Sequence, residues 1–300
     1  MGIGFKGEFS VKKTVLALGS FDGLHKAHMA IIDKTIEYAK EVDCNSAVLL
    51  FDRLPGEIFG QNIQRLMTLN DKKDRLSMLD LVYLCEFSKE FADMEPERFV
   101  DFIIEEFDVC AVCAGFNYRF GKNASGNIET LKEEGKKRGF SVIEVPEYKI
   151  DGETVSSTKI REFIKNGDIK KANNFLGYDF YMSGNVVGGY HIGRTMGIPT
   201  VNLKYDEKCI LPAFGVYAGY VLVDGKSFMA VTNVGKRPTF EREDITVESF
   251  LIDFEGDLYN KEIKVCFSEY LRDEIKFKNK QELAEQIKKD ILSAREILGE

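Results

Sequence analysis

Long apolar runs are missing from this sequence of 300 residues. A membrane-spanning helix needs about 20 consecutive, predominantly apolar residues. Neither the amino-terminal stretch MGIGFKGEFSVKK nor any later segment approaches that length. The sequence therefore predicts a protein without a membrane partner, and we expect it to be cytoplasmic.

Positive charge is also in short supply. The chain has 41 Lys and Arg against 49 Asp and Glu, which gives a formal net charge of −8. This balance argues against broad electrostatic binding to nucleic acid, although a local basic pocket for a small phosphate ligand is compatible with it. We expect small-molecule substrates and no nucleic acid, and the sequence leaves the oligomeric state open.

Cysteine spacings suitable for metal binding are scarce. Only Cys110 and Cys113 stand three residues apart, and they lie in an apolar run typical of a buried strand. Residues three apart on a strand point to opposite faces, so these thiols should not converge. Because no second CxxC is present, the chain lacks the ligands of a structural zinc site.

The chain is long enough for about two domains. Between residues 14 and 180, apolar runs typical of strands alternate with segments of helical periodicity. The predicted strands are 14–18, 46–51, 81–85, 110–114 and 140–145, and helices are predicted near 32–39 and over 71–79, 96–107 and 127–138. This alternation predicts a parallel sheet with helices on both faces, with ligands at the carboxyl ends of the strands.

After Gly177, glycines and short β-rich runs dominate. The predicted strands are 182–187, 201–205, 216–223, 228–233, 246–254 and 263–267, and Asp224-Gly225 indicates a hairpin. They favour a small barrel or sandwich, followed by an amphipathic helix over 281–298. We therefore expect two domains, at residues 1–180 and 181–300.

Histidine is rare, and two of the three histidines stand in GSFDGLHKAH at residues 19–28. Here a predicted strand ends in a glycine-flanked turn and a helix begins near His25. A helix amino terminus attracts anions, so His25 and His28 are expected to stabilise charge on a phosphate under attack. Capping or solvated histidines are the alternative. The turn expected to hold the phosphate contains Gly19, Phe21, Asp22 and Gly23.

Two further stretches are candidate phosphate sites. SSTKIR at 156–161 opens a predicted helix with hydroxyls and two positive charges, which suits a triphosphate; a capped helix with a solvated basic face is the alternative. GGYHIGRT at 188–195 nearly matches GxxxxGK[ST] but lacks the strand and helix of that motif. Its glycines suit either close approach to a phosphate, with Gly193 and Arg194 as candidates, or a plain turn.

Three residues of the second half suggest cation and proton chemistry. Thr200 and Asn202 lie two apart on a predicted strand, so they share one face and offer oxygens to Mg²⁺. Glu248 is a charge within a strand-like run and is a candidate general base. Solvent-facing alternation explains these residues equally well.

The motifs occur in the order found in one family. GSFDGLHKAH is followed by GFNYRFG at 115–121, SSTKIR at 156–161, GRTMGIPTVNL at 193–203, GVYAG at 215–219, NVGKRPTF at 233–240, VESFLIDFEGDLY at 247–259 and LRDE at 271–274. Over nearly its whole length, the chain resembles the bifunctional riboflavin kinase/FMN adenylyltransferases of bacteria.

The resemblance implies an α/β domain followed by a β domain. The first would be a Rossmann-like nucleotidyltransferase domain with a parallel sheet, and the second a small β-barrel riboflavin kinase domain with a terminal helix. The barrel would phosphorylate riboflavin to FMN with ATP, and the first domain would transfer AMP from a second ATP to FMN, forming FAD and releasing pyrophosphate. Mg²⁺ would be the cofactor.

Roles also follow from the resemblance. His25 and His28 would stabilise the α-phosphate transition state, and Glu248 would deprotonate the ribityl hydroxyl. The implied ligands are Asn117 for the nucleotide, Ser157, Thr158 and Arg161 for its phosphates, and Thr200 and Asn202 for Mg²⁺-ATP.

The sequence departs from the family pattern at three places. Ala27 replaces the glycine of HxGH, Phe250 stands where His or Tyr is common, and Asp52-Arg53-Leu54-Pro55 replaces a PHP-like stretch. Two alternatives therefore stay open, namely that only the kinase activity is retained, or that the chain is a non-catalytic flavin-binding protein.

Overall fold

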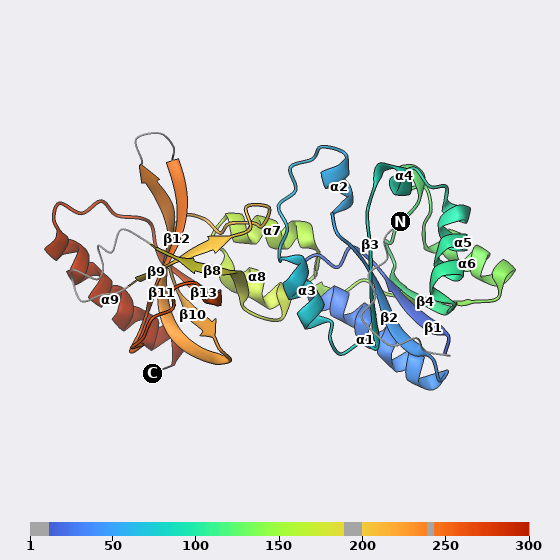
Figure 1. The fold of residues 1–300 in the computed structure, drawn as a ribbon, viewed down its shortest axis with the longest axis horizontal. Coiled ribbons are helices and arrows are strands. Elements are labelled where there is room, and N and C mark those ends of the chain that lie inside the picture. Colours follow the sequence, from blue (N-terminus) through green and yellow to red (C-terminus); the bar gives the residue numbers. More distant parts are fainter. Residues whose placement is uncertain (1–11, 189–199, 239–242, 300) are drawn as a thin grey trace. The chain divides into compact units, whose positions relative to one another are not determined.

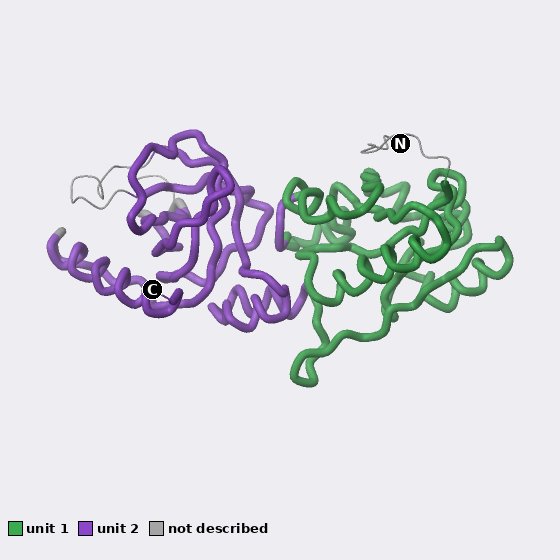
Figure 2. Tube along the Cα trace, turned by 90° about the horizontal axis from the view of Figure 1, so that it is seen from below, with its two compact units in different colours: residues 1–65, 69–156 green, residues 66–68, 157–300 purple. Residues whose placement is uncertain are grey.

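A computed structural model describes residues 12–188, 200–238 and 243–299 (Figure 1). The chain divides into two compact units (Figure 2). Unit 1 comprises Met1–Arg65 and Leu69–Ser156, and unit 2 comprises Leu66–Thr68 and Ser157–Glu300.

Unit 1 is built on a five-stranded parallel sheet. Its strands are β1 (Thr14–Leu18), β2 (Asn45–Phe51), β3 (Leu81–Cys85), β4 (Val109–Gly115) and β5 (Ser141–Val145), in the order β3-β2-β1-β4-β5. The order reverses direction between β1 and β4, and ligands of such sheets bind beyond the strand ends at this switch point. The predicted Rossmann-like fold is confirmed.

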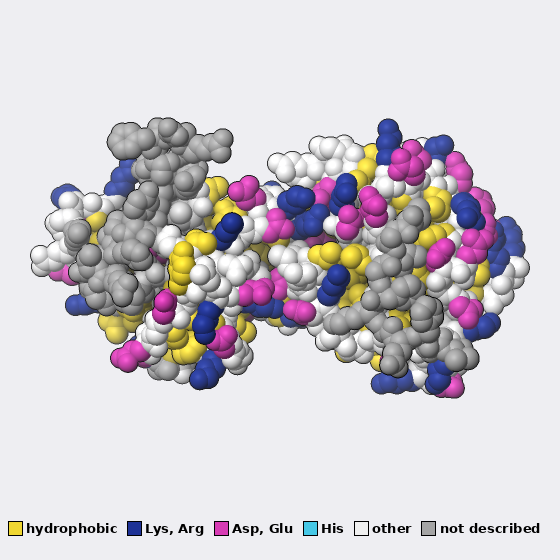
Figure 3. Space-filling view, viewed as in Figure 1, with side chains coloured by type: hydrophobic (Ala, Val, Ile, Leu, Met, Phe, Trp, Pro, Cys, Tyr) yellow, Lys and Arg dark blue, Asp and Glu magenta, His cyan; other side chains and the backbone are white. Residues whose placement is uncertain are grey.

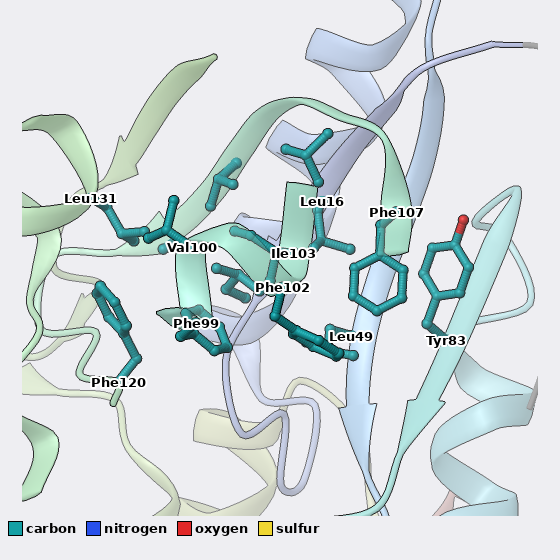
Figure 4. Packing of buried hydrophobic residues seen from close by; sticks show 14 of the residues in the cluster. Leu16, Leu49, Tyr83, Phe99, Val100, Phe102, Ile103, Phe107, Phe120 and Leu131 are labelled. Carbon is teal, nitrogen blue, oxygen red and sulfur yellow. The ribbon is translucent and has the colours of Figure 1, made fainter. Parts of the chain in front are cut away.

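Helices cover both faces of this sheet (Figure 1). Helix α1 (Lys26–Glu41) packs on one face through Ile31, Ile32 and Ala39. Helices α5 (Pro96–Phe107) and α6 (Ile128–Arg138) lie on the other, where Phe99, Phe102, Ile103 and Phe107 of α5 pack with Leu16, Leu49 and Tyr83 (Figure 4). Burial of each such apolar side chain stabilises the fold by about 1.5–3 kcal/mol. The apolar layer therefore fixes the position of β1 and of the loop that follows it.

Short elements complete unit 1. They are α2 (Pro55–Ile58), α3 (Leu69–Arg75), α4 (Lys89–Ala92), the 3₁₀ turn η1 (Lys122–Ala124) and the hairpin of β6 (Lys149–Ile150) and β7 (Glu153–Thr154). The helix predicted over 71–79 therefore ends too late. After Leu76 the backbone bonds join residues three apart, as in Ser77 N–H to Asp74 C=O, so the helix unwinds before β3.

The cysteines of the CxxC have different surroundings. Cys113 is buried, whereas the Sγ of half-buried Cys110 lies 2.9 Å from the Sγ of Cys44. All six cysteines are free. No group of three or more His, Cys, Asp or Glu side chains suited to a metal ion occurs among the described residues.

Unit 2 contains a closed six-stranded barrel. Its strands are β8 (Phe180–Val187), β9 (Thr200–Tyr205), β10 (Gly215–Val223), β11 (Lys226–Pro238), β12 (Glu243–Leu251) and β13 (Glu262–Arg272), in the order β10-β11-β12-β9-β8-β13. All six neighbouring pairs of these strands are antiparallel. Asp224 and Gly225 form the predicted hairpin turn, with φ values of +50° and +74°. Of the two architectures predicted, the structure has the barrel.

Helix α9 (Lys280–Leu298) packs on the outside of this barrel. Its Ala294, Ile291 and Leu298 belong to the same apolar cluster as Val216 and Val231. Asp290 accepts hydrogen bonds of 2.9 and 2.7 Å from Nε and Nη2 of Arg272 on β13. The predicted terminal helix is therefore joined to the barrel by apolar packing and by a buried ion pair.

Two helices precede the barrel within unit 2, α7 (Ser157–Lys165) and α8 (Ile169–Leu176). Asn173 of α8 donates to the carbonyl of Phe267 at 2.8 Å and accepts from the backbone N–H of Phe180 at 2.8 Å. These bonds tie α8 to β13 and β8, so the compact units divide at Ser156. The expected functional division at residue 180 stays a prediction.

Candidate active sites

The loop after β1 has an unusual backbone. Phe21, Gly23 and Leu24 have φ values of +49°, +83° and +39°. Phe21 and Leu24 are fully buried, and a non-glycine residue in the left-handed region costs about 1–3 kcal/mol, a strain that concentrates at functional sites. At Gly19 a Cβ would lie 3.1 Å from Cζ of Phe21. Glycine at position 19 leaves room for the Phe21 ring, which packs against it in loop 19–25.

His25 ends this loop and caps α1. Its Nδ1 accepts a 3.3 Å hydrogen bond from the backbone N–H of His28, and the two imidazoles stack with centroids 3.6 Å apart. No acidic residue stands in the first turn of α1, and Ala27 is absent from the residues with positive φ. The predicted helix start at His25 is confirmed, with both histidines at its positive end.

His28 has an unsatisfied polar atom. Its Nδ1 is buried and has no hydrogen-bond partner. Burial first, then the neighbouring His25 and Lys72, hold the pKa of His28 well below 6.5. A buried polar atom without a partner costs about 1–3 kcal/mol, and an anion at the helix terminus would remove part of that cost. The pair is therefore suited to a phosphate, and Asp22 of the same loop is also buried.

Asn117 follows β4, the neighbour of β1 at the switch point. Leu18 pairs with Ala114, so the loops after the two strands leave the same edge of the sheet. A Cβ at Gly115 would lie 3.5 Å from Oδ1 of Asn117 and 3.5 Å from Cδ1 of Ile31 on α1. The structure thus brings Asn117 close to the helix that carries the histidines.

Lys72 is a residue of this region that the sequence reasoning missed. It lies on α3, is buried, and donates from Nζ to the carbonyl oxygen of Ser20 at 3.2 Å. Its spacing contains a signal, because Leu69, Lys72 and Leu76 recur on one helical face and Leu76 is fully buried. A lysine on an apolar face could have been noticed.

The remaining candidate phosphate residues belong to unit 2. Ser157 and Arg161 are half-buried and Thr158 is exposed, all on α7, which begins at Ser157 as predicted. Gly193 and Arg194 lie outside the described residues.

The three kinase candidates come together on the barrel. Glu248 of β12 pairs with Asn202 of β9, and the hydroxyl of Thr200 donates to Oε1 of Glu248. Opposite residues of an antiparallel pair share a face, as do residues two apart. Thr200, Asn202 and Glu248 therefore line one face, on which Asn202 is buried.

That face is the outer one. Thr232 and Ser249 are fully buried partners that hydrogen-bond at 2.9 Å, and Glu248 points away from them because side chains alternate along a strand. Phe250, two residues from Glu248, packs into the cluster beneath α9. The candidate kinase residues thus lie on the same surface as the terminal helix.

Two motifs without assigned roles also meet here. Asn233 of β11 stands opposite Glu248 and donates to Oε1 of Glu274 at 3.5 Å. A Cβ at Gly235 would lie 1.8 Å from the same Oε1. A side chain at Gly235 would therefore displace the Glu274 carboxylate from its place beside Asn233, and NVG and LRDE come together only through the paired strands.

The oxygens at this place fit a hard cation. The Thr200 hydroxyl, the Asn202 amide and the Glu248 carboxylate are the kinds of ligand that Mg²⁺ takes from a protein. Because the Thr200 proton points to Glu248, the oxygen lone pairs of Thr200 remain available to a cation. One carboxylate with neutral oxygens suits Mg²⁺ that arrives with substrate phosphates.

The charged surface gives no sign of a broad basic region on the face drawn in Figure 3, where the acidic and basic side chains of the described residues are interspersed. No helix among these residues is long and apolar enough to span a membrane.

Together, the fold and these residues define a class of protein with a nucleotide-binding α/β sheet and a β-barrel that carries an acid beside oxygen ligands. Family models match both parts. The FAD synthetase model matches residues 8–159, and the riboflavin kinase model matches residues 176–298. The chain belongs to the bifunctional riboflavin kinase/FMN adenylyltransferase family, as the sequence motifs predicted.

Curated relatives bearing that family name match almost end to end. The relative from Listeria monocytogenes is 32% identical, over 92% of this chain and 90% of its own. Those from Haemophilus influenzae and Escherichia coli K12 are 35% and 33% identical, over 93% and 95% of this chain and 92% and 93% of their own. The correspondence therefore spans both units.

A solved structure has the same fold. It is titled as a macrolide-efflux protein from Streptococcus pneumoniae, is 29% identical, and covers 96% of this chain and 95% of its own with a TM-score of 0.88.

Proposed function

We propose that the chain makes FAD from riboflavin in two steps, with the roles of its residues as follows. The barrel phosphorylates riboflavin to FMN with ATP, and the α/β unit adenylylates FMN with a second ATP and releases pyrophosphate. The observation that best supports the second step is the stacked pair of His25 and His28 at the start of α1, with a buried Nδ1 that lacks a partner.

In adenylyl transfer, His25 and His28 stabilise the charge that develops on the α-phosphate. The turn of Gly19, Phe21, Asp22 and Gly23 approaches the phosphates, and Asn117 contacts the nucleotide. Ser157, Thr158 and Arg161 hold the phosphates, as the family motif implies. A phosphate beside His28 would oppose the lowering of its pKa, so binding is expected to be coupled to proton uptake.

In the kinase reaction, Glu248 accepts the proton of the ribityl hydroxyl. Thr200 and Asn202 hold Mg²⁺, which when bound neutralises charge on the phosphates of ATP. Gly193 and Arg194 contact those phosphates. The hydrogen bond from Thr200 orients the Glu248 carboxylate, so one threonine serves both the cation and the base.

One incubation tests these activities. The protein is mixed with riboflavin, ATP and Mg²⁺, and the flavins are separated by chromatography. FAD is expected. If FMN is the only product, the protein has riboflavin kinase activity alone. If riboflavin is unchanged, the protein is a non-catalytic flavin-binding protein. Replacing Mg²⁺ by a chelator should stop FMN formation if the oxygens of Thr200 and Asn202 act through a bound cation.

We also propose that the protein acts in the cytoplasm on small molecules rather than on nucleic acid. The formal net charge of −8 supports this, because nucleic-acid binding depends on basic surface. Functionally, residues 1–180 would serve adenylyl transfer and residues 181–300 the kinase.

A further inference from the structure

Lys72 is buried at a position where an apolar side chain would be expected. Only 5% of its surface is exposed, yet it carries an ammonium that donates to the Ser20 carbonyl at 3.2 Å. Removing a charge from water is costly, even after the surrounding protein relaxes. The cost of burying the Lys72 ammonium must therefore be offset by specific partners.

Charged groups of both signs face this ammonium. Burial is the main influence and lowers the pKa of Lys72, while Asp22 and Glu57 oppose that shift and Arg65 adds to it. Arg65 is itself held by Glu57 through two hydrogen bonds of 2.7 Å. Lys72 therefore faces the Asp22 carboxylate of loop 19–25. It also faces the bidentate ion pair of Glu57 and Arg65, which joins α2 to the chain before α3.

The loop that Lys72 contacts needs support. Phe21 and Leu24 hold left-handed backbone conformations that bulky residues avoid. The Ser20 carbonyl directly precedes Phe21, so the hydrogen bond from Lys72 restrains the backbone at the first of these residues. The last residue of the loop is His25, whose Nδ1 caps α1 and whose ring stacks on His28.

We propose that Lys72 is a positioning residue for adenylyl transfer. Its ammonium, bound to the Ser20 carbonyl beside Asp22, holds loop 19–25 in the conformation that presents His25 and His28 to the α-phosphate. The proposal rests on the proposed function of the two histidines and adds a residue from another element, 52 positions beyond Ser20.

The first test compares Lys72→Met with Lys73→Met. Methionine keeps most of the apolar stem and removes both donor and charge, and half-buried Lys73 is the next residue of α3. We expect Lys72→Met to lower kcat for FMN to FAD by about 10²-fold, as a small misplacement of reacting groups does, with less change in KM for ATP. Lys73→Met should match the parent. Riboflavin kinase activity should be unchanged in both.

A second readout separates positioning from general weakening of the fold. The chain has only three histidines, so the imidazole signals can be assigned and titrated by NMR. Because Lys72 contributes to lowering the pKa of His28, that pKa should rise in Lys72→Met and stay low in Lys72→Arg, which keeps the charge. In Lys72→Arg, kcat should be intermediate, since the charge remains but the donor geometry differs.

The outcomes are distinguishable. If His28→Ala leaves FAD synthesis intact, the proposed histidine role fails. If His28→Ala abolishes FAD synthesis and Lys72→Met keeps the parental kcat, the positioning role of Lys72 alone is wrong. If the imidazole signals of the folded protein are lost in Lys72→Met, that variant is unfolded, and Lys72→Arg is used to test the proposal instead. The proposal then requires a lowered kcat with an unchanged His28 pKa, and a parental kcat overturns it.

Discussion

At the scale of single residues, the proposed chemistry of each unit depends on a group whose neighbours include residues from distant parts of the chain. Glu248 is an unremarkable glutamate in the sequence, and its candidacy rests on Thr200 and Asn202 beside it. His28 depends likewise on His25 and Lys72. Predictions at this scale therefore concern one atom or one charge.

Glu248→Gln should abolish FMN formation, because an amide cannot accept the hydroxyl proton. Loss of a general base lowers the rate by about 10²–10⁴-fold, and conversion of added FMN to FAD should continue. The measurement is the initial rate of each reaction. The control is Glu262→Gln, which changes an exposed glutamate on β13 of the same barrel. Kinase activity close to that of the parent would remove Glu248 from this role.

Ala27→Gly restores the family glycine. Ala27 lies in the first turn of α1 without positive φ, so the backbone gains nothing from glycine and the helix loses up to about 1 kcal/mol. We expect KM for ATP to change more than kcat, since only a methyl group near the nucleotide is removed. If the parent makes FMN but no FAD and Ala27→Gly makes FAD, the methyl group blocks the site.

The stability of unit 1 should fall on acidification through His28. Its folded pKa lies below the unfolded value of about 6.5, so below that pH the unfolded chain binds more protons. Stability from this group is thus complete above pH ~6.5 and is lost as the pH falls toward the folded pKa. Urea unfolding at neutral and mildly acidic pH gives the free energy of unfolding at each pH. The loss of this free energy on acidification should be smaller in His28→Gln than in the parent. Equal losses would refute the assignment.

At the scale of elements, ion pairs attach two helices to the barrel of unit 2. Asp290 is 4% exposed and receives two hydrogen bonds from Arg272, which attaches α9 to β13. Lys170 of α8 pairs with Glu269 at 2.7 Å, but 70% of its side chain is exposed. The two ion pairs have similar distances, but the Asp290 pair is more buried, so its loss should cost more free energy of unfolding.

Asp290→Ala should therefore destabilise unit 2 by about 3–5 kcal/mol, because it leaves the Arg272 charge partly buried without its partner. Lys170→Ala should cost no more than about 1 kcal/mol, as is usual for an exposed pair. Thermal or denaturant unfolding of the two variants gives the comparison. Similar losses would mean that α9 is attached by its apolar contacts alone.

At the scale of the whole molecule, the candidate residues form two groups, one for each proposed reaction, and the product of one reaction is the substrate of the other. Neither reaction requires a residue that we assign to the other. A chain with one disabled reaction should thus remain competent in the second.

Mixing Glu248→Gln with His28→Ala should restore FAD synthesis from riboflavin, although neither variant makes FAD alone. FMN released by His28→Ala would be adenylylated by Glu248→Gln, so FAD should appear after a lag during which FMN accumulates. Chromatography of timed samples follows both flavins. No FAD from the mixture, with each remaining activity intact, would show that FMN does not exchange between chains.

The fold class and the order of the motifs could be read from local sequence patterns. Apolar runs of strand length alternate with helical periodicity because each must bury one face, so β1 and β4 and the helix starting after His25 were predictable. The Asp224-Gly225 turn was predictable because its positive φ values favour these residues.

Which side chains meet depends on the three-dimensional arrangement of the chain. Lys72 and Ser20 are 52 residues apart, and Glu248 meets Thr200 from 48 residues away. Such contacts depend on strand order, register and burial, which local patterns do not encode. The closure of the barrel was likewise decided by strand pairing. The physical reason is that periodicity specifies which face of an element is buried, whereas long-range packing specifies what it is buried against.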